Sequence, residues 1–274
     1  MSIKSVLVLL DTADDPSARI ETAIGLAREH GAHLAALHVM PRIEIPGVTQ
    51  AYLDTEIIAA QERATREAAA KIEATFNDRA RREGIRAEWR LEKGDVYEIA
   101  ALHARYADLA VVGQTPPEGP IGRLFLEIPE QLVMTSGRPV IVVPYVGSYP
   151  WVGRHVMVAW NGTRESARAV GDALPLLERA ERVTVVGANP SSQSTIPGSD
   201  IGTHLAHHGI EVEVSELHGD DIDIGDMLLS RAADLSIDLI VMGAYGHSRA
   251  REWAVGGVTR HMLKHMTVPV FMSH

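Results

Sequence analysis

The feature that most constrains the fold is an internal repeat, because the same motifs occur twice in the same order along the chain. Val6–Asp11 is repeated as Val156–Asn161, and Asp108–Gly113 is repeated as Asp238–Gly243. Shorter matches pair Ser17–Arg19 with Ser166–Arg168, Gly94-Asp95 with Gly219-Asp220, and Arg138–Ile141 with Val268–Phe271. Such an ordered series is not expected by chance. It predicts two similar domains, residues 1–147 and 148–274.

Each half alternates short apolar runs with amphipathic segments, which is typical of strands separated by helices. The predicted strands are 3–10, 33–39, 85–92, 108–113 and 139–143, then 154–160, 182–188, 210–217, 238–243 and 268–272. A long helix is predicted near 55–83, where Ala, Glu and Arg dominate. Strands that alternate with helices form parallel sheets through right-handed crossovers. The predicted fold class is therefore α/β, with two tandem doubly wound, Rossmann-like domains, each built on a five-stranded, mostly parallel sheet.

Composition narrows the range of functions. Of 274 residues, 46% are hydrophobic and 23% are charged, as in ordinary soluble globular proteins. The net charge of −10 argues against non-specific binding to nucleic acid or to an anionic membrane. The absence of cysteine excludes disulfides, thiolate metal sites and cysteine nucleophiles. No signal peptide and no apolar run of about 18 residues is present, so we expect a cytoplasmic protein.

A glycine-rich loop follows the fourth strand of the second half. Gly243 and Gly246 come directly after the strand, and Gly256 and Gly257 open the next helix after nine intervening residues. In parallel sheets, ligands bind beyond the carboxyl ends of the strands. Glycines let backbone N–H groups approach a ligand, and a helix start offers unpaired donors to an anion. The alternative interpretation is a set of tight turns, but the position of the glycines favours a phosphate-binding loop.

This spacing of Gly, two residues, Gly, nine residues and Gly resembles the signature of the universal stress protein family. Val241–Gly243 and the tail Thr267–Met272 are also similar to the family. Since the resemblance covers both halves, it implies a tandem universal stress protein of the adenine nucleotide α-hydrolase-like fold. It further implies ATP as ligand, with Mg²⁺ or Mn²⁺ as an accompanying ion. The residues that it assigns to the nucleotide are Ala159, Trp160, Asn161, Gly187, Ala188, Met242, Gly243, Gly246, His247, Gly256, Gly257 and Val258.

Two positions depart from the family pattern. Asn161 stands where an acidic residue is frequent, although its amide still forms hydrogen bonds. Gly257 replaces a frequent Ser or Thr, which removes one hydroxyl contact to phosphate. Thr259, two residues later, is expected to cap the helix instead.

The first half is predicted to have lost the nucleotide site. Pro116 stands in place of Gly246, and Leu126 and Glu127 stand in place of the two later glycines. Proline lacks an N–H donor, and a carboxylate at a helix start repels phosphate. Asp11 remains at the end of the first strand, but an isolated carboxylate does not hold a nucleotide. Only the second half is therefore expected to bind ATP.

Other chemistries have weaker support. Histidines gather at His204, His207 and His208 and at His261 and His265, but no cysteine or carboxylate pattern completes a metal site, so we expect exposed or capping roles. No catalytic triad or nucleophile motif occurs. The favoured function is nucleotide-dependent stress response or signalling. The alternatives are a weak ATPase and a module that binds a lipid or metabolite in the first-half crevice.

Assembly is predicted from the last strand of each half. Both 139–143 and 268–272 are apolar, and they occupy equivalent positions in the repeat. By resemblance, single-domain family members dimerise through this strand. Pairing the two strands within one chain would give a pseudo-dimer and cover both sheet edges. The sequence leaves open whether chains dimerise further.

Overall fold

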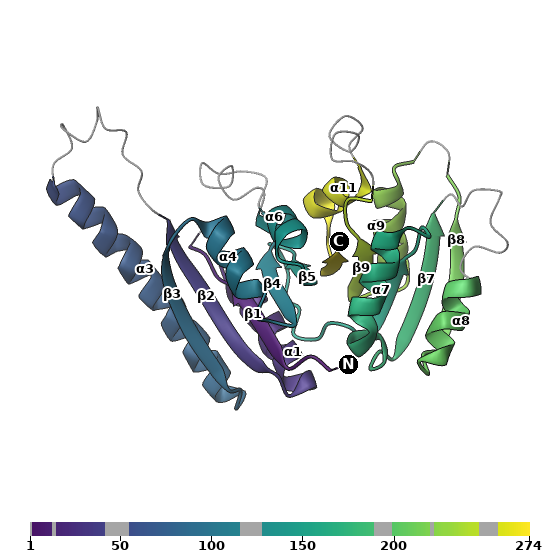
Figure 1. Cartoon of the computed structure of the whole chain (residues 1–274), viewed down its shortest axis with the longest axis horizontal. Helices are drawn as coiled ribbons and strands as arrows, with labels where there is room; N and C mark the ends of the chain where they lie inside the picture. The colour runs from purple at the N-terminus through teal and green to yellow at the C-terminus, as the bar shows by residue number, and fades with distance from the viewer. Residues whose placement is uncertain are drawn as a thin grey trace.

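A computed structural model describes residues 2–12, 15–41, 55–115, 128–188, 199–219, 222–246 and 257–274. Ten strands form one sheet, and helices cover both of its faces (Figure 1). The strands are β1 (Ser5–Leu9), β2 (His33–Pro41), β3 (Ala87–Gly94), β4 (Leu109–Gly113), β5 (Val140–Val143), β6 (His155–Ala159), β7 (Arg182–Ala188), β8 (Val212–Leu217), β9 (Leu239–Gly243) and β10 (Val270–Ser273). The helices are α1 (Ser17–His30), α3 (Thr55–Arg82), α4 (Val96–Ala104), α6 (Ile128–Thr135), α7 (Arg164–Leu177), α8 (Ser199–His207), α9 (Ile224–Asp234) and α11 (Val258–His265).

The sheet repeats one topology in its two halves. The strand order is β3-β2-β1-β4-β5-β10-β9-β6-β7-β8. All pairs within a half are parallel, as predicted, whereas β5 and β10 pair antiparallel with Ile141 opposite Phe271. The predicted pairing of the two final strands is confirmed, and it joins two five-stranded sheets edge to edge. In each half the strand order reverses beside the first strand, between β1 and β4 and between β6 and β9.

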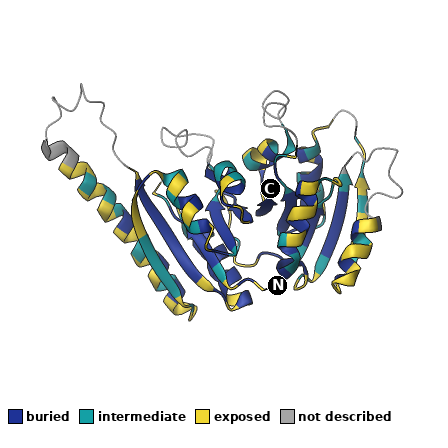
Figure 2. Cartoon of the chain, in the orientation of Figure 1, coloured by how far each residue is buried: buried dark blue, intermediate teal, exposed yellow. Residues whose placement is uncertain are grey.

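Two hydrophobic clusters lie on opposite faces of this sheet. Alternate residues of β1 enter different clusters, Val6 and Val8 on the side of α1 and α7, and Leu7 and Leu9 on the side of α4 and α11. The inner strands of both halves are buried along most of their length, whereas the outermost strands β3 and β8 and the outer helix faces are more exposed (Figure 2). Each cluster contains residues from both halves. The core is therefore continuous across the joint between β5 and β10.

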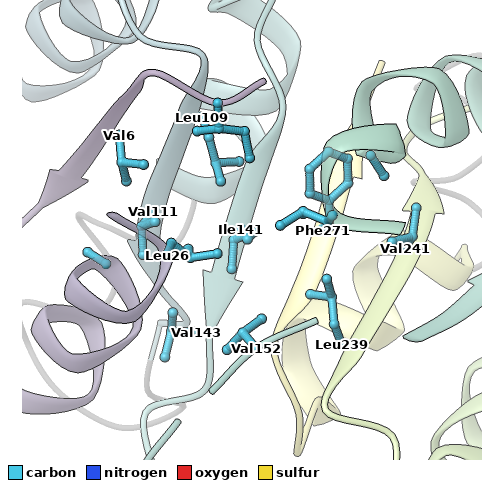
Figure 3. Packing of buried hydrophobic residues seen from close by; sticks show 14 of the residues in the cluster. Val6, Leu26, Leu109, Val111, Ile141, Val143, Val152, Leu239, Val241 and Phe271 are labelled. Atoms are coloured by element: carbon cyan, nitrogen blue, oxygen red, sulfur yellow. The ribbon is translucent and has the colours of Figure 1, made fainter. Parts of the chain in front are cut away.

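Packing at this joint is visible in a close view (Figure 3). Ile141 and Val143 of β5, Val152 of the connecting segment and Phe271 of β10 belong to one buried cluster. Phe271 is 1% exposed, and it lies between the two halves rather than on an outer edge. The second half therefore packs on the first through the same type of apolar side chain that fills each half.

The helix predicted near 55–83 is observed as α3, which has 28 residues. Its C-terminal part is held by the buried residues Ala69, Ile72, Phe76 and Ala80, and more of its N-terminal part is exposed (Figure 2). Even so, α3 is too polar to cross a bilayer, and no other helix in the described ranges has the length and hydropathy to do so.

Candidate functional site

The candidate site lies at the carboxyl ends of β6 and β9, where the strand order of the second half reverses. Ala159 of β6 is paired directly with Met242 of β9, so these two predicted residues are neighbours. On its other side, Ala159 pairs with Val186 of β7, one residue before Gly187. Ligands of open parallel sheets bind at such reversal points. The structure thus brings the predicted strand-end residues to one edge of the sheet.

Asn161 is used by the local backbone. Its side-chain oxygen accepts hydrogen bonds from the N–H of Thr163, at 3.2 Å, and from the Thr163 hydroxyl, at 2.8 Å. Thr163 in turn is the N-cap of α7 and accepts a hydrogen bond from the N–H of Ser166. Asn161 therefore shapes the turn that leads from β6 into α7. Its exposed amide nitrogen has no hydrogen-bond partner in the part of the chain that the structure describes.

Trp160 is one of the residues that the family resemblance assigns to the nucleotide. Its side chain is partly buried and packs against the cluster on the α1 and α7 side of the sheet. Its backbone N–H donates to the carbonyl of Val186 at 2.9 Å, which extends the β6–β7 pairing by one residue. The observed contacts give Trp160 a packing role.

Gly243 has a packing role that spacing alone does not reveal. A Cβ atom at this position would lie 2.5 Å from the carbonyl carbon of Glu165 and 2.5 Å from the nitrogen of Ser166. Those are backbone atoms of the first turn of α7, which cannot move aside easily. The glycine therefore allows the start of α7 to lie directly against the end of β9.

The side chain of Glu165 reaches over the glycine loop, a contact that the sequence analysis missed. Glu165 is 4% exposed, and its Oε2 would lie 3.1 Å from a Cβ at Gly246. Burial alone would raise the pKa of this carboxyl, but the hydrogen bond and positive charge of the exposed Arg164 lower it below its usual value. A carboxylate therefore lies at the entrance of the candidate site.

The loop after β9 is tied to the first turn of α11. Tyr245 has a φ of 57°, in the left-handed region that non-glycine residues seldom adopt. Its N–H donates to the hydroxyl of Thr259, at 3.3 Å. This hydroxyl faces the loop, so the expectation that Thr259 caps the helix is wrong. The N-cap is Gly257, which forms no side-chain capping bond.

In the described part of the chain, the first turn of α11 consequently keeps unpaired donors. The N–H groups of Arg260 and His261 both bond to the carbonyl of Gly257. Among the described residues, the N–H groups of Val258 and Thr259 have no hydrogen-bond acceptor. Of the predicted loop residues, His247 and Gly256 lie outside the described ranges.

The equivalent crevice of the first half is filled by Arg19. This side chain is 5% exposed, and its guanidinium bonds to both carboxylate oxygens of Asp11, at 2.6 and 3.3 Å, and to the carbonyl of Leu9. Its Cδ would lie 3.0 Å from a Cβ at Gly113, the counterpart of Gly243. The repeat equivalent, Arg168, instead pairs with Asp172 along α7. The predicted obstacles Pro116, Leu126 and Glu127 lie outside the described residues.

Comparisons with known proteins agree with the duplicated fold. The model of the Universal stress protein family matches residues 2–144 and again residues 153–274. Universal stress protein Slr1230 from Synechocystis is 26% identical over 148 residues, which cover 52% of this chain and 48% of that protein. The chain thus spans about half the length of the curated relative that it matches.

Two solved structures cover nearly the whole chain. A universal stress protein from Archaeoglobus fulgidus has a TM-score of 0.77 at 16% identity, covering 99% of this chain and 96% of that one. A protein of unknown function from Pseudomonas aeruginosa has a TM-score of 0.61 at 17% identity, covering 99% and 92%. At these identities the similarity supports the fold alone. The double match of the family model confirms the duplication inferred from the sequence.

Proposed function

Because the chain belongs to the universal stress protein family, with both of its halves matched by the family model, we propose that its second half binds ATP. The nucleotide would occupy the crevice at the carboxyl ends of β6 and β9. Its occupancy would serve a nucleotide-dependent role in stress response or signalling. The first half would contribute no second nucleotide site.

The observation that carries this proposal is the uncapped start of α11. The helices that follow β6 and β9 are α7 and α11, and α7 is capped by the side chain of Thr163. The N-cap of α11 is Gly257, which forms no side-chain capping bond, and the N–H groups of Val258 and Thr259 have no acceptor within the described ranges. Unpaired N–H groups and the helix dipole together favour an anion such as phosphate.

Glu165 supports one orientation of the nucleotide. Its carboxylate lies beside Gly246 and repels phosphate, but it accepts hydrogen bonds from hydroxyl groups. We therefore assign the ribose to the side of α7 and the phosphates to the side of α11. A bound Mg²⁺ or Mn²⁺ would further offset the charge between Glu165 and the phosphates.

Arg19 argues against the alternative of a lipid or metabolite in the first-half crevice. Its guanidinium fills the space over Gly113 and neutralises Asp11. A ligand at that point would have to displace a bidentate ion pair whose guanidinium is buried and whose carboxylate is partly buried. Breaking such a pair is strongly unfavourable, because it leaves a charge without its partner.

The test is calorimetric titration of the full chain with ATP, and the key variant is Gly257→Glu, which introduces the residue found at the first-half counterpart. Gly257 has a φ of −51°, which any residue adopts, so the variant should fold. A carboxylate about 4 Å from phosphate costs on the order of 1–4 kcal/mol, or at least roughly fivefold in affinity. The variant Gly257→Gln has a side chain of similar size but no charge, so its affinity for ATP should fall much less.

Wild-type protein should bind one ATP per chain. Two equivalent sites per chain would contradict the proposal, as would a Gly257→Glu variant that binds as tightly as the wild type. Circular dichroism on each variant confirms that the fold is retained.

A further inference from the structure

A second cluster of ligand-type side chains lies where α9 meets α11 in the second half. Asp223 is the N-cap of α9, Asp226 is in its first turn, and His261 is one turn into α11. The Nε2 of His261 is 2.9 Å from Oδ1 of Asp226, and its Nδ1 is 3.4 Å from Oδ1 of Asp223. One nitrogen and two carboxylate oxygens lie within 4.8 Å of one another.

Gly225 leaves the space that the imidazole occupies. A Cβ at this position would lie 2.5 Å from Cδ2 of His261 and 2.9 Å from Oδ1 of Asp223. Any larger residue would therefore push the ring away from the carboxylates. The side chain of His261 is only 17% exposed, so the ring is held between the two helices rather than projecting into solvent.

The first half provides an internal comparison. There α4 begins after the N-cap Asp95, with Glu98 in its first turn, so a pair of carboxylates is retained at the same place. The residue equivalent to Gly225, counted from the N-cap, is Tyr97, and the repeat equivalent of His261 is Gln131. Helix capping explains the carboxylates in both halves. It does not explain why the second half alone combines an imidazole with the glycine that makes room for it.

We propose that Asp223, Asp226 and His261 form a binding site for a divalent transition-metal ion of the Zn²⁺ class. Imidazole nitrogen and carboxylate oxygen are ordinary zinc ligands, and bonds of about 2.1 Å place neighbouring ligands about 3 to 4 Å apart. The two aspartates face different nitrogens of the ring, so the ion takes one of these nitrogens. The aspartate on the other side then rotates to close a donor separation of at most 4.8 Å. Both aspartates are partly exposed, so an ion reaches the site from solvent and keeps at least one position for water.

Charge also favours a cation here. Asp223 and Asp226 hold two negative charges close together, and His261 is a metal ligand in its neutral form. A divalent ion would neutralise both carboxylates and link α9 to α11. This site does not depend on nucleotide binding, since none of its three residues belongs to the glycine loop.

The test is calorimetric titration of the full, untagged chain with ZnCl₂ near neutral pH in a buffer that does not bind zinc. Wild-type protein should bind one ion at the site. Asp226→Asn and His261→Gln should each weaken binding at least about tenfold, because each removes one of only three protein ligands. The second of these variants introduces the first-half residue.

The matched control addresses a different pair of histidines. His204 and His208 are exposed at the C-terminal end of α8, and their ring centres are 5.0 Å apart. Exposed pairs of histidines of this kind bind zinc adventitiously. The double variant His204→Gln/His208→Gln should keep the site. His265, whose ring centre is 4.5 Å from that of His261, is a second alternative partner. If zinc were bound by a pair of histidines alone, Asp226→Asn would not change the affinity for zinc.

Cobalt provides a second readout. Co²⁺ bound to nitrogen and oxygen ligands should give visible absorption bands with the wild type that are lost with His261→Gln. The proposal is overturned if zinc affinity is unchanged in Asp226→Asn and His261→Gln, or if only the α8 double variant loses the ion.

Discussion

At the carboxyl end of β9, two residues determine how much space is left for a ligand. Gly243 leaves room for the chain's own α7 rather than for a ligand, and Glu165 from that helix then reaches over Gly246. In the first half, the same space over Gly113 is filled by Arg19. The two halves thus differ in the charged side chain at this place. The first half has the guanidinium of Arg19, paired with Asp11, and the second half has the carboxylate of Glu165, paired with the exposed Arg164.

Gly243→Ala should destabilise the protein by about 1–3 kcal/mol, because the added methyl group meets backbone atoms of α7 that cannot rotate away. The measurement is the free energy of unfolding in urea. Gly171→Ala is the matched control, since a Cβ at that position in α7 meets nothing within 4 Å. It should be neutral or stabilise by up to about 1 kcal/mol. Equal stability of the Gly243→Ala variant and the wild type would contradict the packing role.

The sequence predicted the glycine loop but not the side chains around it. Strand order and the repeat place the loop of Gly243 and Gly246 at one sheet edge, because apolar runs and their spacing determine where each strand ends. The reach of Arg19 and Glu165 depends on helix position and rotamer, which spacing does not encode. The proximity of Asp226 to His261, 35 positions apart, likewise arises from the packing of two helices.

Helix α11 is held differently at its two ends. At its start, Thr259 is 3% exposed and accepts the N–H of Tyr245. At its end, the first-half residue Gln114 donates from Nε2 to the carbonyls of Leu263, at 3.0 Å, and Lys264, at 3.1 Å. The helix is thereby fixed to its own loop and to the other half.

Thr259→Val should weaken this arrangement, because it leaves the N–H of Tyr245 without its acceptor at nearly constant side-chain volume. The expected loss is about 0.5–1.5 kcal/mol of unfolding free energy, the usual net contribution of one hydrogen bond. Amide hydrogen exchange at Tyr245 should become faster. Thr259→Ser, which keeps the hydroxyl, should behave like the wild type. Unchanged exchange at Tyr245 in the valine variant would show that this hydrogen bond does not hold the loop.

On the scale of the whole molecule, the two halves are joined by more than the β5–β10 pairing. The segment between them packs on α1, where the Thr22 hydroxyl donates to the carbonyl of Tyr149 and Gly25 allows close approach of Pro150. At the end of α1, His30 is buried, and the positive charge of Arg179 in the second half contributes to lowering its pKa. The sequence predicted that the final strands pair, but not these contacts, which need the two halves already docked.

His30 should make the docked structure sensitive to acid. Burial, with a smaller contribution from the Arg179 charge, lowers the pKa of His30 from 6.5 to about 4. As the pH falls, the unfolded chain binds a proton at His30 at a higher pH than the folded chain does. The contribution of neutral His30 to the free energy of unfolding is therefore complete above pH 6.5 and is lost as the pH falls towards 4. The contribution is at most about 3 kcal/mol.

The measurement is urea unfolding at a series of pH values between neutral and mildly acidic. His30→Gln should lose less stability than the wild type over this range, whereas the exposed-site control His33→Gln should follow the wild-type curve. Parallel curves for His30→Gln and the wild type would show that His30 carries a similar proton affinity in both states.

Because β5 and β10 belong to one chain, their antiparallel pairing does not depend on the protein concentration. Two separate subunits that meet through such strands dissociate when their concentration falls below the dissociation constant. Here the partners share one backbone, so each experiences the other at an effective concentration that short connections typically raise to about the millimolar range. One half in which Arg19 fills the strand-end space and one half in which Gly257 starts α11 are therefore present at a ratio of one to one, however scarce the protein becomes.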